Sequence, residues 1–453
     1  MIVEDDNDDG MAKRKKVAMP FNNINTSRDH FEERRPLHVE VVIHSTCPTP
    51  LPTLREMWKQ HFSSGAPILW TANGMINITA LPDNLQKGCV RACVYTGEAL
   101  VPGFRKGMNL PLDPVDVHTF MLSDEEVSTE ELEPNGGDDE WTAGCDSLTL
   151  PHSSLDGLWE NLIFESTVKR NLLDYAQSAL LFSDKAVSSH IVNWNRILML
   201  YGPPGTGKTS LCRALAQKIA IRMGHRFTRT TLLEIHSHSL FSKWFSTSGK
   251  LVNTLFQLVR EMVQDDPNTL ICVLIDEVES LASSRGNTVG DPSDAMRAVN
   301  SLLTSLDRLR SFPNVVVLTT TNLTSSVDAA FVDRVDMKIH IDVPILEARY
   351  EILRSCLNEL QRVGITITPN RTEEGIFLFP PFQEALRCDL AIPLVDCAHK
   401  AQGLSGRSLR RLPLQAHARF LSCKASPSVV EFVQALSMAI DAEHSSKKLM
   451  ESH

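Results

Sequence analysis

The stretch Gly202-Pro-Pro-Gly-Thr-Gly-Lys-Thr209 decides the fold, and it directly follows the apolar run Arg196-Ile-Leu-Met-Leu-Tyr201. Its glycines let the backbone curl so that N–H groups point inward at phosphate oxygens. A buried strand, a glycine-rich loop, a lysine and a hydroxyl residue in this order form the pattern of a phosphate-binding P-loop. The sequence therefore predicts a nucleotide site at the end of a buried strand.

Each position of this loop has an expected task. Lys208 brings a positive charge to the β- and γ-phosphates, and Thr209 offers a hydroxyl to Mg²⁺. The run from Ser210 to Ile219 reads as a helix whose positive N-terminal end faces the phosphates. The loop residues expected to contact the nucleotide are Gly202, Pro203, Pro204, Gly205, Thr206, Gly207, Lys208, Thr209 and Ser210.

Two acids follow the next apolar run, because Ile271-Cys-Val-Leu-Ile275 ends in Asp276 and Glu277. A nucleotide-hydrolysing P-loop needs an acid that helps to hold Mg²⁺ and a base that orients the attacking water. We assign Asp276, together with Thr209, to Mg²⁺ and Glu277 to the water. Alone, the pair would equally fit two solvated acids in a turn. Behind a P-loop, it favours ATP hydrolysis with ATP and Mg²⁺ as cofactors.

Two polar residues further along the chain are candidates for the same site. Asn322 ends the apolar run Val315–Thr321, so its amide would reach the γ-phosphate or the attacking water. Arg334 is the only basic residue of the segment Asp328–Arg334, which follows this run. The ordinary alternative for Arg334 is an ion pair with Asp333 or Asp336.

A third candidate is Arg407, which follows Gly403-Leu-Ser-Gly406 at the start of a predicted helix. From a helical lid, its guanidinium would close over the phosphates. Ser405 and Gly406 also fit a plain helix cap, and this reading is compatible with the functional one.

The apolar runs and helical spacings predict an α/β fold. Runs that are almost entirely apolar are typical of a parallel sheet buried on both faces. From Leu346 onward the apolar residues recur at helical spacing. We therefore expect a P-loop module, made of a parallel sheet flanked by helices plus a helical lid, behind a small N-terminal α+β domain.

The α+β domain is predicted from strands at 38–43 and 89–95 and a helix at 54–62. It carries no catalytic motif, so a substrate- or adaptor-binding role is the default. The expected organisation is a disordered tail over 1–35, this domain over 36–120, an acidic linker over 121–149, the large ATPase subdomain over 150–343, the lid over 344–445 and a tail over 446–453.

Composition and the lack of certain patterns argue against several classes of function. The net charge of −10 argues against a general nucleic-acid binder, which usually shows a basic face. None of the 10 cysteines forms a paired zinc pattern, which indicates core thiols in a reducing compartment. The acidic N-terminus does not resemble a signal peptide, and no apolar run is long enough to span a membrane. The cluster Lys13-Arg-Lys-Lys16 is either a nuclear-import signal or a solvated charge run.

With these motifs in order, the chain resembles the AAA+ ATPases over about residues 150–445. It is most similar to the pachytene checkpoint protein family, also called thyroid receptor-interacting proteins. The segment 365–381 is unlike the family pattern and reads as an insertion in the lid. The runs that carry the resemblance are Leu155–Trp159, Leu181–Lys185, Ser237–Ser246, Leu274–Ser280, Phe331–Arg334 and Gly403–Pro413.

The resemblance implies roles for the later candidates. Asn322 stands at the sensor-1 position, Arg334 at the arginine finger that reaches the neighbouring subunit's γ-phosphate, and Arg407 at sensor 2. It also implies a homo-hexameric ring that engages HORMA-domain proteins, often through a HORMA-fold adaptor, and converts closed conformers to open ones. No membrane or nucleic-acid partner is expected.

Family members disassemble spindle-checkpoint complexes and remove HORMA proteins from meiotic chromosomes. The implied locations are therefore nucleus and cytoplasm, with meiotic chromosomes and the kinetochore as sites of action. Substrate would be gripped by a pore loop at Lys243, Trp244 and Phe245, because aromatic side chains hold an extended chain without sequence selectivity. The alternative is that the two aromatics are core. A second pore loop is expected near 285–290.

Three competing interpretations remain. One is a nucleic-acid-acting AAA+ ATPase, which the acidic charge balance disfavours. Another is a different AAA+ protein unfoldase, or a microtubule-severing relative, whose polymer-binding character the N-terminal region lacks. The third is an inactive nucleotide-gated scaffold, against which Glu277, Asn322 and Arg334 argue.

Overall fold

The computed structural model describes residues 37–64, 74–96, 99–100, 115–132, 142–235, 248–282, 292–322, 327–366, 378–422 and 424–451. Several predictions fall outside these residues: the tail over 1–35 with its basic cluster, the pore residues Lys243, Trp244 and Phe245, and the stretch 285–290. Most of the predicted lid insertion also lies outside them.

The N-terminal region forms a four-stranded sheet in the order β3-β2-β1-β4, with β1 and β4 parallel and the other pairs antiparallel. Leu54, Trp58 and Phe62 lie on one face of α1 and are buried in the core of this sheet. The predicted strands and helix are confirmed. The elements are β1 (Leu37–Ile43), α1 (Leu51–Ser63), η1 (Ile78–Ala80), α2 (Asp83–Gln86), β2 (Cys89–Thr96), β3 (Ala99–Leu100) and β4 (Val115–Phe120).

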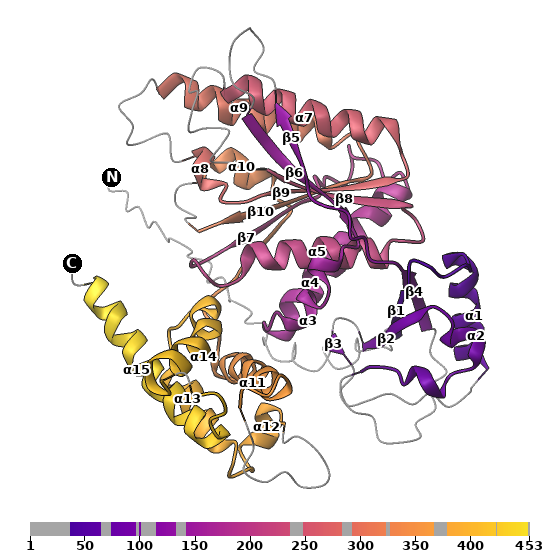
Figure 1. Cartoon of the computed structure of the whole chain (residues 1–453). Coiled ribbons are helices and arrows are strands. Elements are labelled where there is room, and N and C mark those ends of the chain that lie inside the picture. The colour runs from indigo at the N-terminus through magenta and orange to yellow at the C-terminus, as the bar shows by residue number, and fades with distance from the viewer. Residues whose placement is uncertain are drawn as a thin grey trace, which may run out of the picture.

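A seven-stranded sheet forms the centre of the molecule, in the order β11-β7-β10-β9-β8-β6-β5 (Figure 1). The five strands from β11 to β8 are parallel, which confirms the predicted α/β fold. Three of these parallel strands were predicted from apolar runs, whereas β8 and β11 were not. The strands are β5 (Ser128–Leu132), β6 (Thr142–Leu150), β7 (Ile197–Tyr201), β8 (Arg229–Ile235), β9 (Thr269–Ile275), β10 (Val315–Thr321) and β11 (Met337–His340).

The prediction of an extended or mobile linker over 121–149 is wrong for the residues of β5 and β6. β6 pairs antiparallel with β8, and β5 pairs antiparallel with β6, so both strands extend the central sheet. The acidic residues suggested a solvated tether. Cys145 and Leu148 are nevertheless buried under the sheet's helices. Pairing with β8 gives the backbone N–H and C=O groups of β6 hydrogen-bond partners.

Helices cover both faces of the central sheet. Alternate residues of β7 show why: Ile197 and Met199 pack in the cluster with α7 and α9, and Leu198 and Leu200 pack in the cluster with α4 and α5. The helices of this part are η2 (Ser153–Leu155), α3 (Leu158–Asn161), α4 (Ser166–Asp184), α5 (Lys208–Arg222), α7 (Ser248–Asp265), α8 (Glu279–Ala282), α9 (Pro292–Leu309) and α10 (Ala329–Arg334).

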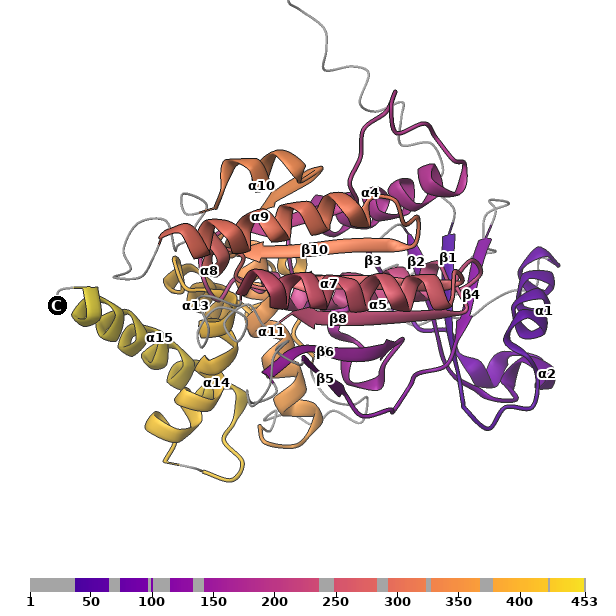
Figure 2. The same ribbon diagram turned by 90° about the horizontal axis from the view of Figure 1, so that it is seen from above.

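The C-terminal part is helical, as predicted, and has its own apolar core. Figures 1 and 2 show this lid toward one end of the central sheet and the N-terminal sheet toward the other end. Among the described helices, none combines the length and apolarity that crossing a membrane requires. The lid helices are α11 (Leu346–Arg362), α12 (Phe382–Ala385), α13 (Ile392–Lys400), α14 (Gly406–Phe420) and α15 (Val429–Glu451).

Buried charges join the N-terminal sheet to α5, the helix that begins at the P-loop. Lys218 Nζ lies 2.7 Å from Glu40 Oε2 and Arg222 Nε lies 2.8 Å from Glu40 Oε1. The three side chains are at most 5% exposed. Lys218 also lies 3.8 Å from the centre of the Tyr95 ring, and the Tyr95 hydroxyl donates to Glu160 at 2.7 Å. No local sequence pattern predicts this cluster, because its members lie far apart in the chain.

Candidate active site

The P-loop leaves the carboxyl end of β7 and leads into α5, as predicted. Gly202 has φ of 141°, and a Cβ there would lie 2.2 Å from the carbonyl oxygen of Ile341. Gly207 has φ of 96° and is the N-cap of α5. Both positions need glycine because of their positive φ. At Gly202, a side chain would also collide with the chain that follows β11.

Lys208 is buried within the loop. Its ammonium donates hydrogen bonds of 2.8 Å to the carbonyl oxygens of Gly202 and Pro203. Burial lowers the pKa of Lys208, while the nearby carboxylates of Glu279, Asp276 and Glu277 oppose that shift. These acids help to keep the lysine charged, so the loop presents a cation where phosphate oxygens would bind.

Asp276 and Thr209 meet as the sequence predicted. The Thr209 hydroxyl donates to Asp276 Oδ1 at 2.8 Å, and the Thr320 hydroxyl donates to the same oxygen. Mg²⁺ prefers oxygen ligands and usually keeps several waters beside one or two protein groups and substrate phosphates. The Thr209 hydroxyl and the Asp276 carboxylate fit this requirement. No cluster of three or more His, Cys, Asp or Glu suited to a metal occurs among the described residues.

Glu277 follows Asp276 with an unusual backbone. Its φ is 53°, in the left-handed region that non-glycine residues rarely adopt. Its N–H donates to Thr320 Oγ1 at 3.1 Å. The Asn322 amide nitrogen approaches Glu277 Oε1 to 3.5 Å, and the Asn322 N–H donates to Glu279 Oε1 at 2.8 Å. The structure thus brings the predicted base and the predicted sensor-1 residue together.

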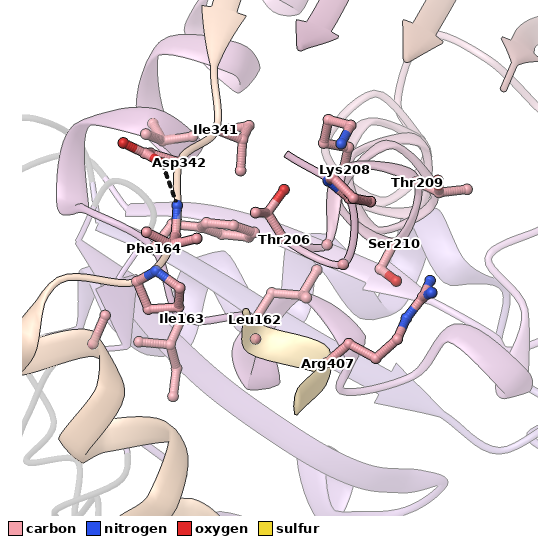
Figure 3. A pocket seen from close by; sticks show the side chains of 18 of the residues that line it. Leu162, Ile163, Phe164, Thr206, Lys208, Thr209, Ser210, Ile341, Asp342 and Arg407 are labelled. Carbon is pink, nitrogen blue, oxygen red and sulfur yellow. Dashed lines mark hydrogen bonds between the residues drawn. The ribbon is translucent and has the colours of Figure 1, made fainter. Parts of the chain in front are cut away.

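One pocket of about 580 Å³ collects most of the predicted site (Figure 3). The volume is in the usual range for small-ligand sites. Arg407 lines it from the start of α14, where its N–H donates to the carbonyl oxygen of Gly205 at 3.0 Å. The lid is thereby attached to the loop itself. The predicted residues that line the pocket are Pro204, Gly205, Thr206, Gly207, Lys208, Thr209, Ser210, Asp276, Glu277, Asn322 and Arg407.

The apolar end of the pocket was not predicted from the sequence. Leu162, Ile163 and Phe164 line it from the segment between α3 and α4, and the chain from Ile341 to Ile345 lines it before α11 (Figure 3). An apolar slot beside phosphate-binding groups suits the flat base of a nucleotide. These residues have no motif of their own, so the sequence offered little signal for them.

Arg334 does not line this pocket. Its Nε and a terminal nitrogen both lie 2.8 Å from the carboxylate oxygens of Asp307, in a bidentate pair. Asp307 raises the pKa of Arg334. The expected alternative partners were Asp333 and Asp336. Asp336 instead accepts from the Tyr175 hydroxyl at 2.6 Å and from the N–H of Asn195 at 2.8 Å. Within one chain, Arg334 is therefore outside the nucleotide site.

Comparisons with known proteins agree with this architecture. The family model for the ATPase family associated with various cellular activities (AAA) matches residues 198–343. The model for the TRIP13-like AAA+ ATPase lid C-terminal domain matches residues 345–444. The pachytene checkpoint protein 2 homolog of Oryza sativa subsp. indica is 48% identical over 334 residues, which are 70% of each chain.

Solved structures show the same likeness. The structure of C. elegans PCH-2 is 31% identical, has a TM-score of 0.73 and covers 91% of this chain and 100% of its own. A complex described as E. coli MS115-1 HORMA:CdnC:Trip13 contains a chain that matches with a TM-score of 0.51 at 17% identity. That match covers 65% of this chain and 93% of the other, and it is a likeness of fold.

Proposed function

Since this chain belongs to the pachytene checkpoint protein 2 family of AAA ATPases, we propose that it uses ATP hydrolysis to remodel HORMA-domain proteins. The observation that carries the proposal is that one pocket brings together the P-loop, the two acids, Asn322 and Arg407 of the lid, whose N–H donates to the Gly205 carbonyl oxygen. The HORMA-containing complex of a Trip13 relative supports the choice of substrate class.

The chemistry follows from where the side chains lie. When bound, ATP supplies the phosphoryl group and Mg²⁺ neutralises charge on it. Thr209 and Asp276 would hold Mg²⁺, and Lys208 would pair with the phosphates. The Glu277 carboxylate accepts a proton from the attacking water, and Asn322 orients that carboxylate.

We propose further that the working unit is a homo-hexamer in which Arg334 completes the site of the next subunit. Its position outside the chain's own pocket supports action on a neighbour. To act there, Arg334 has to exchange Asp307 for the partner's phosphate, and the bidentate geometry of guanidinium suits both.

The proposed substrate path runs through the centre of that ring. Lys243, Trp244 and Phe245 would grip an extended segment of a HORMA-domain protein, so that closed conformers become open ones. A HORMA-fold adaptor would present the substrate. The proposed settings are spindle-checkpoint complexes and meiotic chromosomes, hence nucleus and cytoplasm, including the kinetochore.

The test is capture by a hydrolysis-deficient trap. Glu277→Gln is mixed with cell extract in ATP, and the bound proteins are identified by mass spectrometry, with wild-type protein and ATP-free samples as controls. We expect HORMA-domain proteins to bind only the variant and only in ATP. Capture of other folded proteins without any HORMA protein, or ATPase activity stimulated by DNA in a salt-sensitive way, would contradict the proposal.

A further inference from the structure

Strand β10 carries three consecutive threonines at the edge of the active site. Thr319, Thr320 and Thr321 are at most 1% exposed. A buried hydroxyl costs free energy unless it has a hydrogen-bond partner, so the partner of each hydroxyl is informative. The Thr319 hydroxyl donates to the carbonyl oxygen of Leu198 on the neighbouring strand at 3.0 Å. That bond fastens β10 to β7 and involves no acid.

The Thr320 hydroxyl instead contacts both acids at the end of β9. It donates to Asp276 Oδ1, and it accepts from the N–H of Glu277 at 3.1 Å. A hydroxyl has one proton to donate and lone pairs to accept with, so the two bonds are compatible. Asp276 Oδ1 therefore receives hydroxyls from two sides, Thr209 of α5 and Thr320 of β10.

The backbone of Thr320 adds a further contact. Its carbonyl oxygen accepts from the N–H of Val278 at 2.9 Å. Glu277 lies between these two contacts and has φ of 53°. Such a conformation is unfavourable for a residue with a side chain and persists only where the surroundings enforce it. Thr320 supplies that enforcement on both sides of the strained residue.

We propose that Thr320 is the positioning residue for both catalytic acids. Its hydroxyl holds the Asp276 carboxylate against Thr209, where Mg²⁺ would bind, and holds the Glu277 backbone in the left-handed conformation that places the base. Thr320 lines the pocket, and the role proposed for it runs through the two acids that it contacts. Because both acids depend on one hydroxyl, its loss affects metal use and turnover together. The proposal rests on the ATPase activity and not on the identity of the remodelled protein.

The experiment compares Thr320→Val with Thr319→Val in the full-length protein. Both variants remove one buried hydroxyl of β10 and keep a β-branched side chain, but only Thr320→Val removes contacts to the acids. Steady-state ATPase assays give kcat and KM, and a magnesium titration gives the Mg²⁺ concentration for half-maximal rate. Thermal unfolding of each variant reports on structural damage.

For Thr320→Val we expect kcat to fall by about 10²-fold, since a displacement of order 1 Å has that effect on a catalytic group. The Mg²⁺ requirement should rise, whereas KM for ATP changes by less than about threefold because the P-loop is intact. Thr320→Ser keeps the hydroxyl and should restore most of kcat. Thr319→Val should keep kcat and the Mg²⁺ requirement even if its melting temperature falls.

Two results would overturn the proposal. One is an equal loss of kcat in Thr319→Val and Thr320→Val, which would indicate a role in strand packing alone. The other is a Thr320→Ser variant as impaired as Thr320→Val. If Thr320→Val does not fold, Thr320→Ala replaces it, and the same comparison of kcat and Mg²⁺ requirement with Thr320→Ser decides the question.

Discussion

Glu277 is the single residue on which turnover is expected to depend most directly. Its strained backbone lies at the end of β9, and its carboxylate lies 3.5 Å from the Asn322 amide. Most of the groups expected to hold the phosphates lie elsewhere in the pocket, in the P-loop and the first turn of α5. A substitution at this residue should therefore reduce ATP hydrolysis without reducing nucleotide binding.

Glu277→Gln tests that separation. The amide has nearly the shape of the carboxylate but cannot take up a proton, so kcat should fall by about 10²–10⁴-fold. Nucleotide affinity should stay within about threefold of wild type, because the P-loop contacts are retained. Steady-state ATPase assays and fluorescent-nucleotide binding measure the two quantities. Normal turnover in this variant would show that Glu277 is not the base.

At the scale of elements, the nucleotide pocket is a junction of loop, strand and lid. The P-loop touches the chain after β11 at Gly202, and the start of α14 touches the loop at Gly205. A Cβ at Gly205 would lie 2.9 Å from the Ser405 hydroxyl. Movement of the lid is therefore coupled to the loop through direct contacts, and the glycines are what allow the elements to approach.

Gly202→Ala should disrupt this junction. The new Cβ would overlap the Ile341 carbonyl oxygen at 2.2 Å, so the loop has to move. Gly364→Ala is the matched control, because Gly364 has φ of 80° but nothing within 4 Å of a Cβ. Both variants should lose about 1–3 kcal/mol of stability from backbone strain. Only Gly202→Ala should lose ATP affinity, by about tenfold or more as the loop shifts.

Denaturant unfolding and nucleotide titrations measure the two effects. Equal ATP affinity in Gly202→Ala and Gly364→Ala would mean that contact with Ile341 does not shape the phosphate site.

At the scale of the whole molecule, the N-terminal sheet is attached to the ATPase part through the helix that starts at the P-loop. Glu40 pairs with both Lys218 and Arg222 in a site where all three are almost completely buried, and Glu160 lies 3.3 Å from Lys218 as a second carboxylate. A charge left alone in such a site is costly, so the cluster fixes the N-terminal sheet on α5. A shift of α5 on nucleotide binding would move that sheet with it.

Glu40→Gln should therefore destabilise the folded protein by about 3–5 kcal/mol, because the buried cations Lys218 and Arg222 both lose the Glu40 carboxylate and only Lys218 keeps a second carboxylate, that of Glu160. Glu359→Gln breaks the exposed pair between Glu359 and Arg362 and should have little effect. Denaturant unfolding of both variants measures the difference. A Glu40→Gln protein as stable as Glu359→Gln would mean that the cluster does not hold the N-terminal sheet in place.

The proposed ring makes a separate prediction about Arg334. Arg334→Ala subunits keep their own base, and Glu277→Gln subunits keep their arginine, so each supplies what the other lacks. Each variant alone should have little ATPase activity, and mixtures should recover a part of the wild-type rate. ATPase assays across mixing ratios measure this recovery. No recovery at any ratio, in samples shown to assemble, would count against action on a neighbouring subunit.

The sequence by itself determined the parts of the site that have short-range patterns. The P-loop between β7 and α5, the acids after β9 and Asn322 after β10 could be found because each follows a buried strand. The carboxyl ends of parallel strands meet at one edge of the sheet, so chain order alone indicates that these residues meet. The position of Arg407 beside the loop also followed from its motif.

Only the tertiary structure decided what depends on pairing between distant segments. Strands β5 and β6 read as an acidic linker because strand pairing with β8, not composition, places them in the sheet. The contacts of Glu40 with α5, of Asp307 with Arg334 and of Thr320 with the acids join residues that no local pattern relates. Hydrogen bonds and ion pairs form wherever folding brings two groups together. The number of residues between the groups in the chain does not indicate how close they lie in the folded protein.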